Sequence, residues 1–164
     1  MATIRRIQKG EADLFRQIRL EALREAPYAF SSTYESAIQR SAESWREQAD
    51  SSAQGSHRAT FIAFSEGLPI GIAALYRLED QADAGEVLQV WVAPEFRETG
   101  VAWDLMDLVF KWAGENNFRR IIAGVTKVNP RALKFYSKYG FSVMDEPVSN
   151  LPDCLSLVKE VGRG

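Results

Sequence analysis

The sequence predicts a mixed α/β (α+β) domain in which a sheet of about seven strands carries about four helices on both faces. Short apolar runs of strand character alternate along the chain with amphipathic helical segments, and Gly, Pro and Asn separate them. This alternation favours a mixed sheet with helices packed on both sides. The chain has 164 residues and no internal repeat or linker, so we expect a single domain spanning residues 1–164.

The charge and composition argue against several classes of protein. The formal net charge is −2, the isoelectric point is about 5.5 and the basic residues are scattered, so no nucleic-acid partner is expected. Only one cysteine and one histidine, Cys154 and His57, are present, which argues against a metal site and a disulfide framework. Cys154 is expected to be a small core residue. We see no signal peptide or membrane-spanning run, so we expect a cytoplasmic protein without a membrane partner.

The first third of the chain predicts one strand and two helices. Thr3–Ile7 alternates apolar and polar residues, as a short strand does. Glu11–Glu25 carries apolar residues at helical spacing and is followed by Pro27, which ends the helix. A shorter helix is expected to start near Ser41. The intervening segment 26–35, APYAFSSTYE, is rich in aromatic and hydroxyl side chains and has no clear period.

The remaining chain predicts six strands and two helices. Residues 59–65 and 70–78 flank a hairpin turn, and 86–92 (EVLQVWV) is apolar enough for a central strand covered on both faces. A helix begins near Gly100, and another runs from the N-cap Asn129 to a terminal Gly140. The last strands are expected at 121–126, 141–144 and 154–161.

The segment 90–106, VWVAPEFRETGVAWDLM, joins a buried strand to a helix through a turn after Pro94. The first turn of such a helix has unpaired backbone N–H groups, and the helix dipole adds partial positive charge there. Gly100 and Ala102 let a bulky anion approach the main chain. The segment therefore favours a phosphate or pyrophosphate site, although many such turns hold a glycine for packing alone. Its glycine spacing fits neither a Walker A loop nor a dinucleotide-binding fingerprint.

The same turn resembles the acetyl-CoA motif of the GNAT-type N-acetyltransferases. That motif has Arg or Gln, two residues, Gly, one residue, and Gly or Ala, and Arg97–Ala102 reads RETGVA. A second block of the family, NPRALKFYSKYGF, follows at the expected distance over Asn129–Phe141. The resemblance includes LPIGI at Leu68–Ile72 and covers most of the chain from Ala59 to Phe141.

The resemblance implies a twisted, mostly antiparallel GNAT-type sheet in a monomer or homodimer. It also implies direct transfer of acetyl from the cosubstrate acetyl-CoA to a primary amine of a small molecule or peptide, in a ternary complex. Backbone N–H groups in 90–92 would bind the acetyl carbonyl as oxyanion donors. The implied cofactor-binding residues are Val90, Trp91, Val92, Arg97, Glu98, Thr99, Gly100, Val101, Ala102, Asn129 and Tyr136.

The chain departs from the family pattern at Glu98 and Thr99, where the family often has basic or small residues. A carboxylate near a pyrophosphate weakens binding unless it points to solvent. Because the main-chain donors do not depend on those side chains, we retain the site and expect weaker binding.

Glu86 is the candidate general base. An alkyl amine has a pKa of about 10.4, so only about one molecule in a thousand is neutral near pH 7, and a group must accept its proton. Related enzymes commonly carry a catalytic glutamate six residues before the position of Val92. In a regular strand Glu86 shares a face with Leu88, Val90 and Val92, whereas a β-bulge, frequent in the family, changes this facing. The alternative is a solvated carboxylate at the strand end.

Tyr136 is the candidate general acid, because it matches the family tyrosine and a phenol can donate a proton to the departing thiolate. It also falls in a helical stripe with Ala132, Phe135 and Tyr139, and the ring can pack while the hydroxyl reaches the sulfur. Tyr139 is expected only to pack or to lie on the surface. Asn129 is expected to cap its helix and to contact the pantetheine or phosphate part of CoA, although capping alone would explain it.

The acceptor amine is not identified by the sequence. In the implied fold the first two helices and their connecting loop cover the acceptor groove, and a segment of this composition can also serve only to pack the helix pair. Two other readings stay open: an acyl-CoA-binding sensor or regulatory domain without turnover, and an interaction domain without CoA, which leaves both motif blocks unexplained. The residues placed near the acceptor are Tyr28, Phe30, Ser31, Ser32 and Tyr34.

Overall fold

The computed structural model of the protein describes residues 2–27, 30, 32–145 and 154–162. Its elements, in chain order, are β1 (Thr3–Arg6), α1 (Ala12–Glu25), α2 (Tyr34–Ile38), α3 (Ala42–Ser52), β2 (Arg58–Ser65), β3 (Leu68–Arg77), β4 (Ala84–Val92), the 3₁₀ turn η2 (Pro94–Phe96), α4 (Val101–Glu115), β5 (Arg120–Thr126), α5 (Pro130–Tyr139), β6 (Ser142–Val143) and β7 (Cys154–Glu160). Every predicted strand and helix is present. The sequence reasoning missed α2, which is too short to show a helical period.

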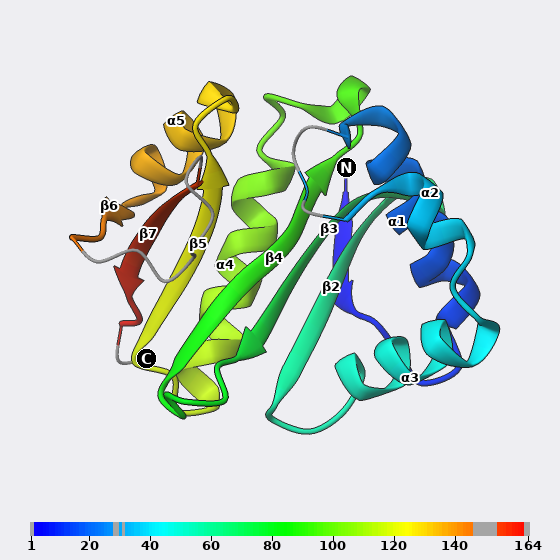
Figure 1. The fold of residues 1–164 in the computed structure, drawn as a ribbon, viewed down its shortest axis with the longest axis horizontal. Helices are drawn as coiled ribbons and strands as arrows, with labels where there is room; N and C mark the ends of the chain where they lie inside the picture. Colours follow the sequence, from blue (N-terminus) through cyan, green and yellow to red (C-terminus); the bar gives the residue numbers. More distant parts are fainter. Residues whose placement is uncertain (1, 28–29, 31, 146–153, 163–164) are drawn as a thin grey trace.

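The strands form a seven-stranded sheet in the order β1-β2-β3-β4-β5-β7-β6. Neighbouring strands are antiparallel except for β4 and β5, which are parallel. The predicted mostly antiparallel sheet is therefore confirmed. β4 and β5 pair only from Ala84 with Arg120 to Val87 with Ala123, although both strands continue beyond this point. They diverge toward their C-terminal ends, like the arms of a V (Figure 1).

Helices cover both faces of the sheet, as predicted. On one face α4 lies so close that a Cβ atom on Gly71 of β3 would be 3.2 Å from Leu105 and 3.4 Å from Val101. On the other face, Gln48 of α3 donates a hydrogen bond of 2.8 Å to the hydroxyl of Tyr76 on β3. α1 lies beside α3 on that face, whereas α5 packs against α4 on the first (Figure 1).

The hydrophobic core lies on both faces of the central strands. Trp91 and Val87 of β4 are each only 4% exposed, which agrees with the prediction of a strand covered on both sides. Each such side chain contributes about 1.5–3 kcal/mol to stability. The helices bury Phe15, Ile18 and Leu23 from α1 and Leu105, Met106 and Val109 from α4.

A β-bulge interrupts β4 before its end. On β3, Ile72 and Ala74 are two residues apart, whereas their partners on β4, Trp91 and Leu88, are three residues apart. Gln89, inside the bulge, has a φ of +60°, which is unusual for a residue with a side chain. One extra residue is therefore present on β4.

The bulge changes which side chains share a face of β4. Because the extra residue shifts the alternation, Trp91 instead of Val90 follows Leu88 on the face that carries Glu86. Val92 lies on the opposite face, toward α4. The facing predicted for a regular strand, with Glu86 and Val92 on one side, is therefore wrong.

Candidate functional site

The N-terminus of α4 presents a row of unpaired backbone N–H groups. The N–H groups of Phe96 and Arg97 close the η2 turn, and the first bond of the helix runs from Asp104 N–H to Gly100 O at 3.0 Å. Between them, no N–H group from Glu98 to Trp103 donates to a backbone oxygen of a described residue. These groups and the helix dipole make the turn suitable for an anion.

Two residues of this turn have left-handed backbone conformations. Gly100 has a φ of +93°, and a Cβ atom placed there would meet no atom within 4 Å. The backbone conformation, and not crowding by the protein, therefore favours glycine at this position. Glu98 has a φ of +66°, and its side chain is exposed to solvent. Because its carboxylate is exposed to solvent, Glu98 need not weaken the binding of an anion in the turn.

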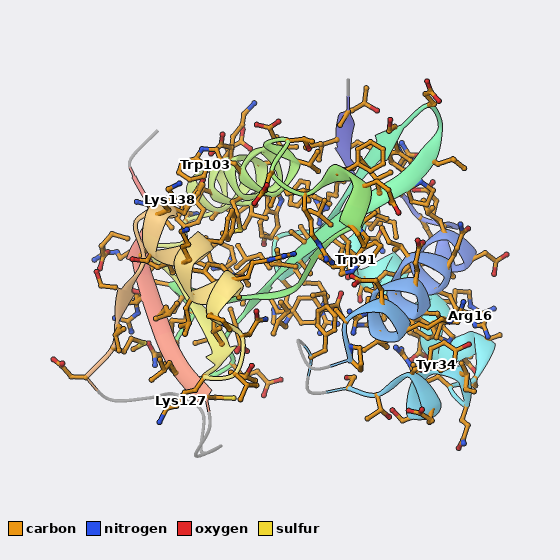
Figure 2. All side chains as sticks on the ribbon, turned by 90° about the horizontal axis from the view of Figure 1, so that it is seen from above. Arg16, Tyr34, Trp91, Trp103, Lys127 and Lys138 are labelled. Carbon is orange, nitrogen blue, oxygen red and sulfur yellow. The ribbon has the colours of Figure 1, made fainter. Side chains whose placement is uncertain are left out.

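The side chain of Arg97 connects the end of β4 to the end of α1. Arg97 Nε donates to Val92 O at 3.0 Å, and its Nη2 forms an ion pair with Glu25. Trp91 Nε1 donates to the same carboxylate at 2.9 Å (Figure 2 shows Trp91 on the α1 side). Burial alone would raise the pKa of the Glu25 carboxyl, but these two donors outweigh it and the pKa is lowered. The Nε and Nη2 atoms of Arg97 are thus engaged by the protein itself, and the backbone of Arg97 lies at the start of the turn.

The bulge in β4 lies where β5 has already diverged. Gln89 and Val90 have no register partner on β3, and no residue of β5 pairs with this part of β4. The Oε1 atom of Gln89 is buried and accepts no hydrogen bond from the described residues. Since buried polar atoms are nearly always paired, this oxygen has room for a donor that the protein does not supply.

Tyr136 lies on α5 with its ring in the core. The residue is 7% exposed, and its ring packs edge-on against Phe135 and Phe141, with centroid separations of 5.4 and 5.1 Å. The predicted packing role is therefore confirmed. Burial raises the pKa of the phenol well above its ordinary value, so the hydroxyl stays protonated and can donate.

The ends of α5 carry the capping residues that the sequence predicts. Asn129 Oδ1 accepts a hydrogen bond of 3.3 Å from the Ala132 N–H, which confirms the N-cap. Gly140 ends the helix with a φ of +119°, as expected of a C-terminal glycine.

Tyr139 fills the packing role expected of it. Its hydroxyl donates to Asp107 of α4 at 2.7 Å, and its ring lies 4.7 Å from that of Trp103 and 5.3 Å from that of Phe110. These contacts join α5 to α4 next to the free N–H row. Figure 2 shows Trp103 on this side of the sheet, opposite Trp91.

Glu86 is partly buried on the sheet face covered by α1 and α3. A Cβ atom placed on Gly124 would be 3.7 Å from Glu86 Oε2, so the carboxylate lies over β5. Burial raises the pKa of this carboxyl, as suits a group that takes up a proton. Glu86 and Val90 are four residues apart, about 13 Å along a strand, so a proton moving between them requires water or the bound substrate.

The residues predicted near the acceptor are only partly described. Tyr28 and Ser31 lie outside the described residues. Ser32 is exposed, and the hydroxyl of Tyr34 accepts a hydrogen bond of 2.9 Å from Arg24 of α1. Tyr34 is thus engaged with the outer part of α1.

Phe30, the remaining residue predicted near the acceptor, lies next to Arg19, which was not predicted as a site residue. Arg19 is 5% exposed, and its guanidinium carbon lies 5.1 Å from the centre of the Phe30 ring. Burial lowers the pKa of Arg19 to about 10, with an opposing effect of Tyr76 and a further lowering by Arg40. The available signal was a basic residue at an inward position of the apolar stripe of α1.

A polar cavity of about 520 Å³ opens between α3 and the start of β2. It lies away from the N-terminus of α4 and contains none of the predicted site residues. Its lining residues are Arg40, Ser44, Glu47, Gln48, Ser51, His57 and Arg58.

The described ranges contain neither a membrane-spanning helix nor a metal-binding cluster. No helix there is long and apolar enough to cross a membrane. No group of three or more His, Cys, Asp or Glu side chains in those ranges could hold a metal ion. Cys154 is only partly buried at the start of β7, so its prediction as a core residue is wrong: the first residue of this strand is not fully covered.

Known proteins with sequences similar to this chain include N-acetyltransferases. An uncharacterised N-acetyltransferase of Mycobacterium tuberculosis is 35% identical over 86 residues, which are 52% of this chain and 54% of that protein. Aminoglycoside N(6′)-acetyltransferase type 1 of Salmonella typhimurium is 30% identical over 94 residues, covering 54% of this chain and 65% of that protein. The chain thus spans about half the length of the first of these relatives.

Solved structures share the fold at low sequence identity. An acetyltransferase of the GNAT family from Streptococcus pneumoniae superposes with a TM-score of 0.82 at 18% identity, covering 99% of this chain and 100% of that one. Spermidine N-acetyltransferase from Vibrio cholerae, in complex with CoA and spermine, gives a TM-score of 0.75 at 17% identity, with coverage of 98% and 95%.

A third solved structure, a putative acetyltransferase from Salmonella typhimurium with its cofactor acetyl-CoA, gives a TM-score of 0.79 at 15% identity, covering 99% of this chain and 95% of that one. The model of the acetyltransferase (GNAT) family matches residues 17–141, which are most of the chain. The protein therefore belongs to the GNAT acetyltransferase family.

Proposed function

We propose that the protein is an N-acetyltransferase that moves the acetyl group of acetyl-CoA to a primary amine by direct transfer in a ternary complex. The observation that carries this proposal is the row of free N–H groups from Glu98 to Trp103 next to the point where β4 and β5 diverge. The relatives with CoA or acetyl-CoA in their structures support the choice of donor.

The residues present fit coenzyme A. The N–H row at the start of α4 would hold the pyrophosphate, because it combines free donors with the positive end of the helix dipole. The unpaired Oε1 of Gln89 would accept a hydrogen bond from one of the amide N–H groups of pantetheine. Asn129 would contact the same part of the molecule from the start of α5. Bound acetyl-CoA supplies the thioester whose acetyl group is transferred.

Backbone N–H groups in 90–92 would donate to the acetyl oxygen as negative charge develops on it. The bulge supports this assignment, because it interrupts the regular ladder at Gln89 and Val90 beside the diverging strands.

Glu86 would accept the proton that the amine loses as its nitrogen bonds to the acetyl carbon. The raised pKa and the position over β5 support this role. Tyr136 would protonate the sulfur as the carbon–sulfur bond breaks, and its buried, neutral hydroxyl supports that assignment. Each proton then has a defined donor and acceptor.

A two-part measurement tests the proposed function. Saturating acetyl-CoA is expected to raise the melting temperature by several degrees, since ligand at 100 times its Kd adds about 2.7 kcal/mol of stability. Release of the CoA thiol is then followed over a panel of amines and peptides. No stabilisation by acetyl-CoA would contradict the proposal, and stabilisation without thiol release from any acceptor would identify an acyl-CoA-binding domain.

A further inference from the structure

Arg19 of α1 is a buried cation without an acidic partner. It is 5% exposed, its Nη1 atom is buried, and that atom makes no hydrogen bond to the described part of the chain. The ion pairs among the described residues involve Arg5, Arg46 and Arg97, and none includes Arg19. A buried guanidinium without a counter-charge is costly, so its retention points to an anion that the protein does not itself supply.

Two more arginines gather near Arg19 around Tyr76 of β3. Arg40 is close enough to lower the pKa of Arg19, and the guanidinium carbon of Arg58 lies 4.3 Å from the centre of the Tyr76 ring. Arg58 Nε is also buried without a partner among the described residues. Glu47, which lines a cavity with Arg40 and Arg58, forms no ion pair with either. Three arginines (Arg19, Arg40 and Arg58) thus outnumber the two glutamates of this region, Glu47 and Glu86, and the net local charge is positive.

This positive region lies beside the candidate base. Tyr76 is paired in register with Glu86, so their side chains project from the same face about 5 Å apart at Cβ. Glu25, six residues after Arg19 and thus about 9 Å further along α1, contacts Trp91 near the end of β4. Arg19 therefore lies near Tyr76, on the sheet face that carries Glu86, and one to two helical turns (about 9 Å) before the end of α1 that contacts Trp91.

We propose that Arg19 binds a carboxylate on the acceptor, so that the acceptor is a small amino acid whose amine faces Glu86. This inference rests on the proposed function and specifies its substrate class. A guanidinium offers two parallel N–H donors that match both oxygens of a carboxylate. The Phe30 ring, 5.1 Å from the guanidinium carbon, supports the plane of that fork.

The same charges disfavour a polycationic acceptor. Spermine and aminoglycosides carry several ammonium groups, and Arg19, Arg40 and Arg58 would repel them. A repulsive contact of this kind contributes to specificity as much as an attractive one does.

Matched acceptor pairs test the inference. Amino acids with the amine at increasing distance from the carboxylate are each compared with the corresponding carboxamide, and kcat/KM is measured by thiol release. The enzymes are the wild type, Arg19→Met, and the control Arg16→Met, an exposed arginine on the same helix (Figure 2). The wild type is expected to prefer an acid over its amide at least about tenfold. Arg19→Met should lose about 100-fold on the acid and little on the amide, with the KM for acetyl-CoA unchanged.

Each outcome decides a separate point. An Arg19→Met enzyme that keeps the preference for the acid, or a wild type that acetylates amides, acidic peptides or polyamines at least as well, overturns the inference and leaves the proposed function standing. Absence of both acetyl-CoA binding and thiol release overturns the proposed function instead. If Arg19→Met does not fold, the inference is tested instead by the ratio of kcat/KM for the acid to kcat/KM for the amide, measured in the wild type and in Arg19→Lys. A preference lost in Arg19→Met and retained in Arg16→Met supports the carboxylate site.

Discussion

Burial shifts the pKa of Tyr136 and the pKa of Glu86 in the same direction, and the two shifts have different consequences for catalysis. It raises the pKa of both groups, because a low-polarity environment disfavours their charged forms. The phenol therefore stays a donor at every physiological pH. The carboxyl becomes a stronger base than an ordinary glutamate, at the cost of being protonated at a higher pH.

Tyr136→Phe is expected to lower kcat by about 100-fold, because it removes the hydroxyl and leaves the ring packed on Phe141. The KM for acetyl-CoA should change little. Tyr139→Phe is the matched control, since it removes a hydroxyl bonded to Asp107 at 2.7 Å. Steady-state thiol release on both variants makes the comparison. Equal rates for Tyr136→Phe and the wild type would remove this hydroxyl from the chemistry.

Glu86→Gln is expected to lower kcat/KM most at pH values that lie between the raised pKa of Glu86 and the pKa of the amine. In the wild type the rate should fall as the pH drops through the pKa of Glu86, because the protonated carboxyl cannot accept a proton. Above about pH 10 the amine is already neutral and the two enzymes should converge. A pH profile of thiol release checks this, and a constant ratio of rates across pH would make Glu86 a bystander.

At this scale, residues whose environment is local in sequence were predictable and those with distant partners were not. The cap at Asn129 and the glycine at Gly140 follow from neighbours within one helix. Glu25 contacts Trp91 and Arg97 across separations of 66 and 72 residues, which no local pattern encodes. The burial of Arg19 was not predictable from the sequence, because it depends on the packing of α1 against the sheet.

At the scale of elements, the turn before α4 depends on the backbone of Gly100. Gly100→Ala should weaken acetyl-CoA binding about tenfold or more, because a side chain at a φ of +93° strains the turn and projects into open space. Gly10→Ala is a matched control, with the same φ of +93° and no atom within 4 Å of its Cβ. Both variants should lose about 1 kcal/mol of stability.

Calorimetric titration with acetyl-CoA separates the two glycines. Only Gly100→Ala should lose affinity, and an equal loss in both variants would show that general destabilisation is responsible and that the turn is not the binding site.

The bulge in β4 shows where element-level prediction stops. The run EVLQVWV identifies a buried strand, and the second of its two polar residues, Gln89, is the one at positive φ. The period of two that assigns faces fails once a residue is inserted, and the insertion is visible only against β3. The existence of the strand was predictable, but the facing of its second half was not.

For the whole molecule, the contact of Glu25 with Arg97 and Trp91 links α1 to the end of the central strand. Glu25→Gln should lower the free energy of unfolding by about 1 kcal/mol near pH 7, since both charged side chains are only partly exposed. The folded pKa of Glu25 lies below its unfolded value, so this stabilisation exists above about pH 4.3 and is lost as the pH falls through the folded pKa.

Denaturant unfolding at several pH values measures this effect. The variant should show a smaller loss of stability on acidification than the wild type. Glu43→Gln, which removes a surface ion pair of 3.9 Å with Arg46, should leave the pH dependence unchanged. A similar acid response of the wild type and Glu25→Gln would contradict the assignment.

The global architecture was predictable to the level of strand order along the chain and the presence of helices on both faces. Local hydrophobic patterns and turn residues carry that information, and the family resemblance implied the antiparallel arrangement. The point at which β4 and β5 diverge was not predictable, because it depends on the register of two strands separated in sequence by α4.

That divergence divides the sheet mechanically. β1 to β4 form one half-sheet and β5, β7 and β6 form the other, and the backbone seam between them is confined to the short stretch from Ala84 to Val87. Beyond the seam the halves are held on one side by α4 and the aromatic contacts of Trp103 and Tyr139. A ligand bound between the diverging strands would contact both half-sheets and couple their motions. The protein should therefore be more rigid with a ligand bound than without one.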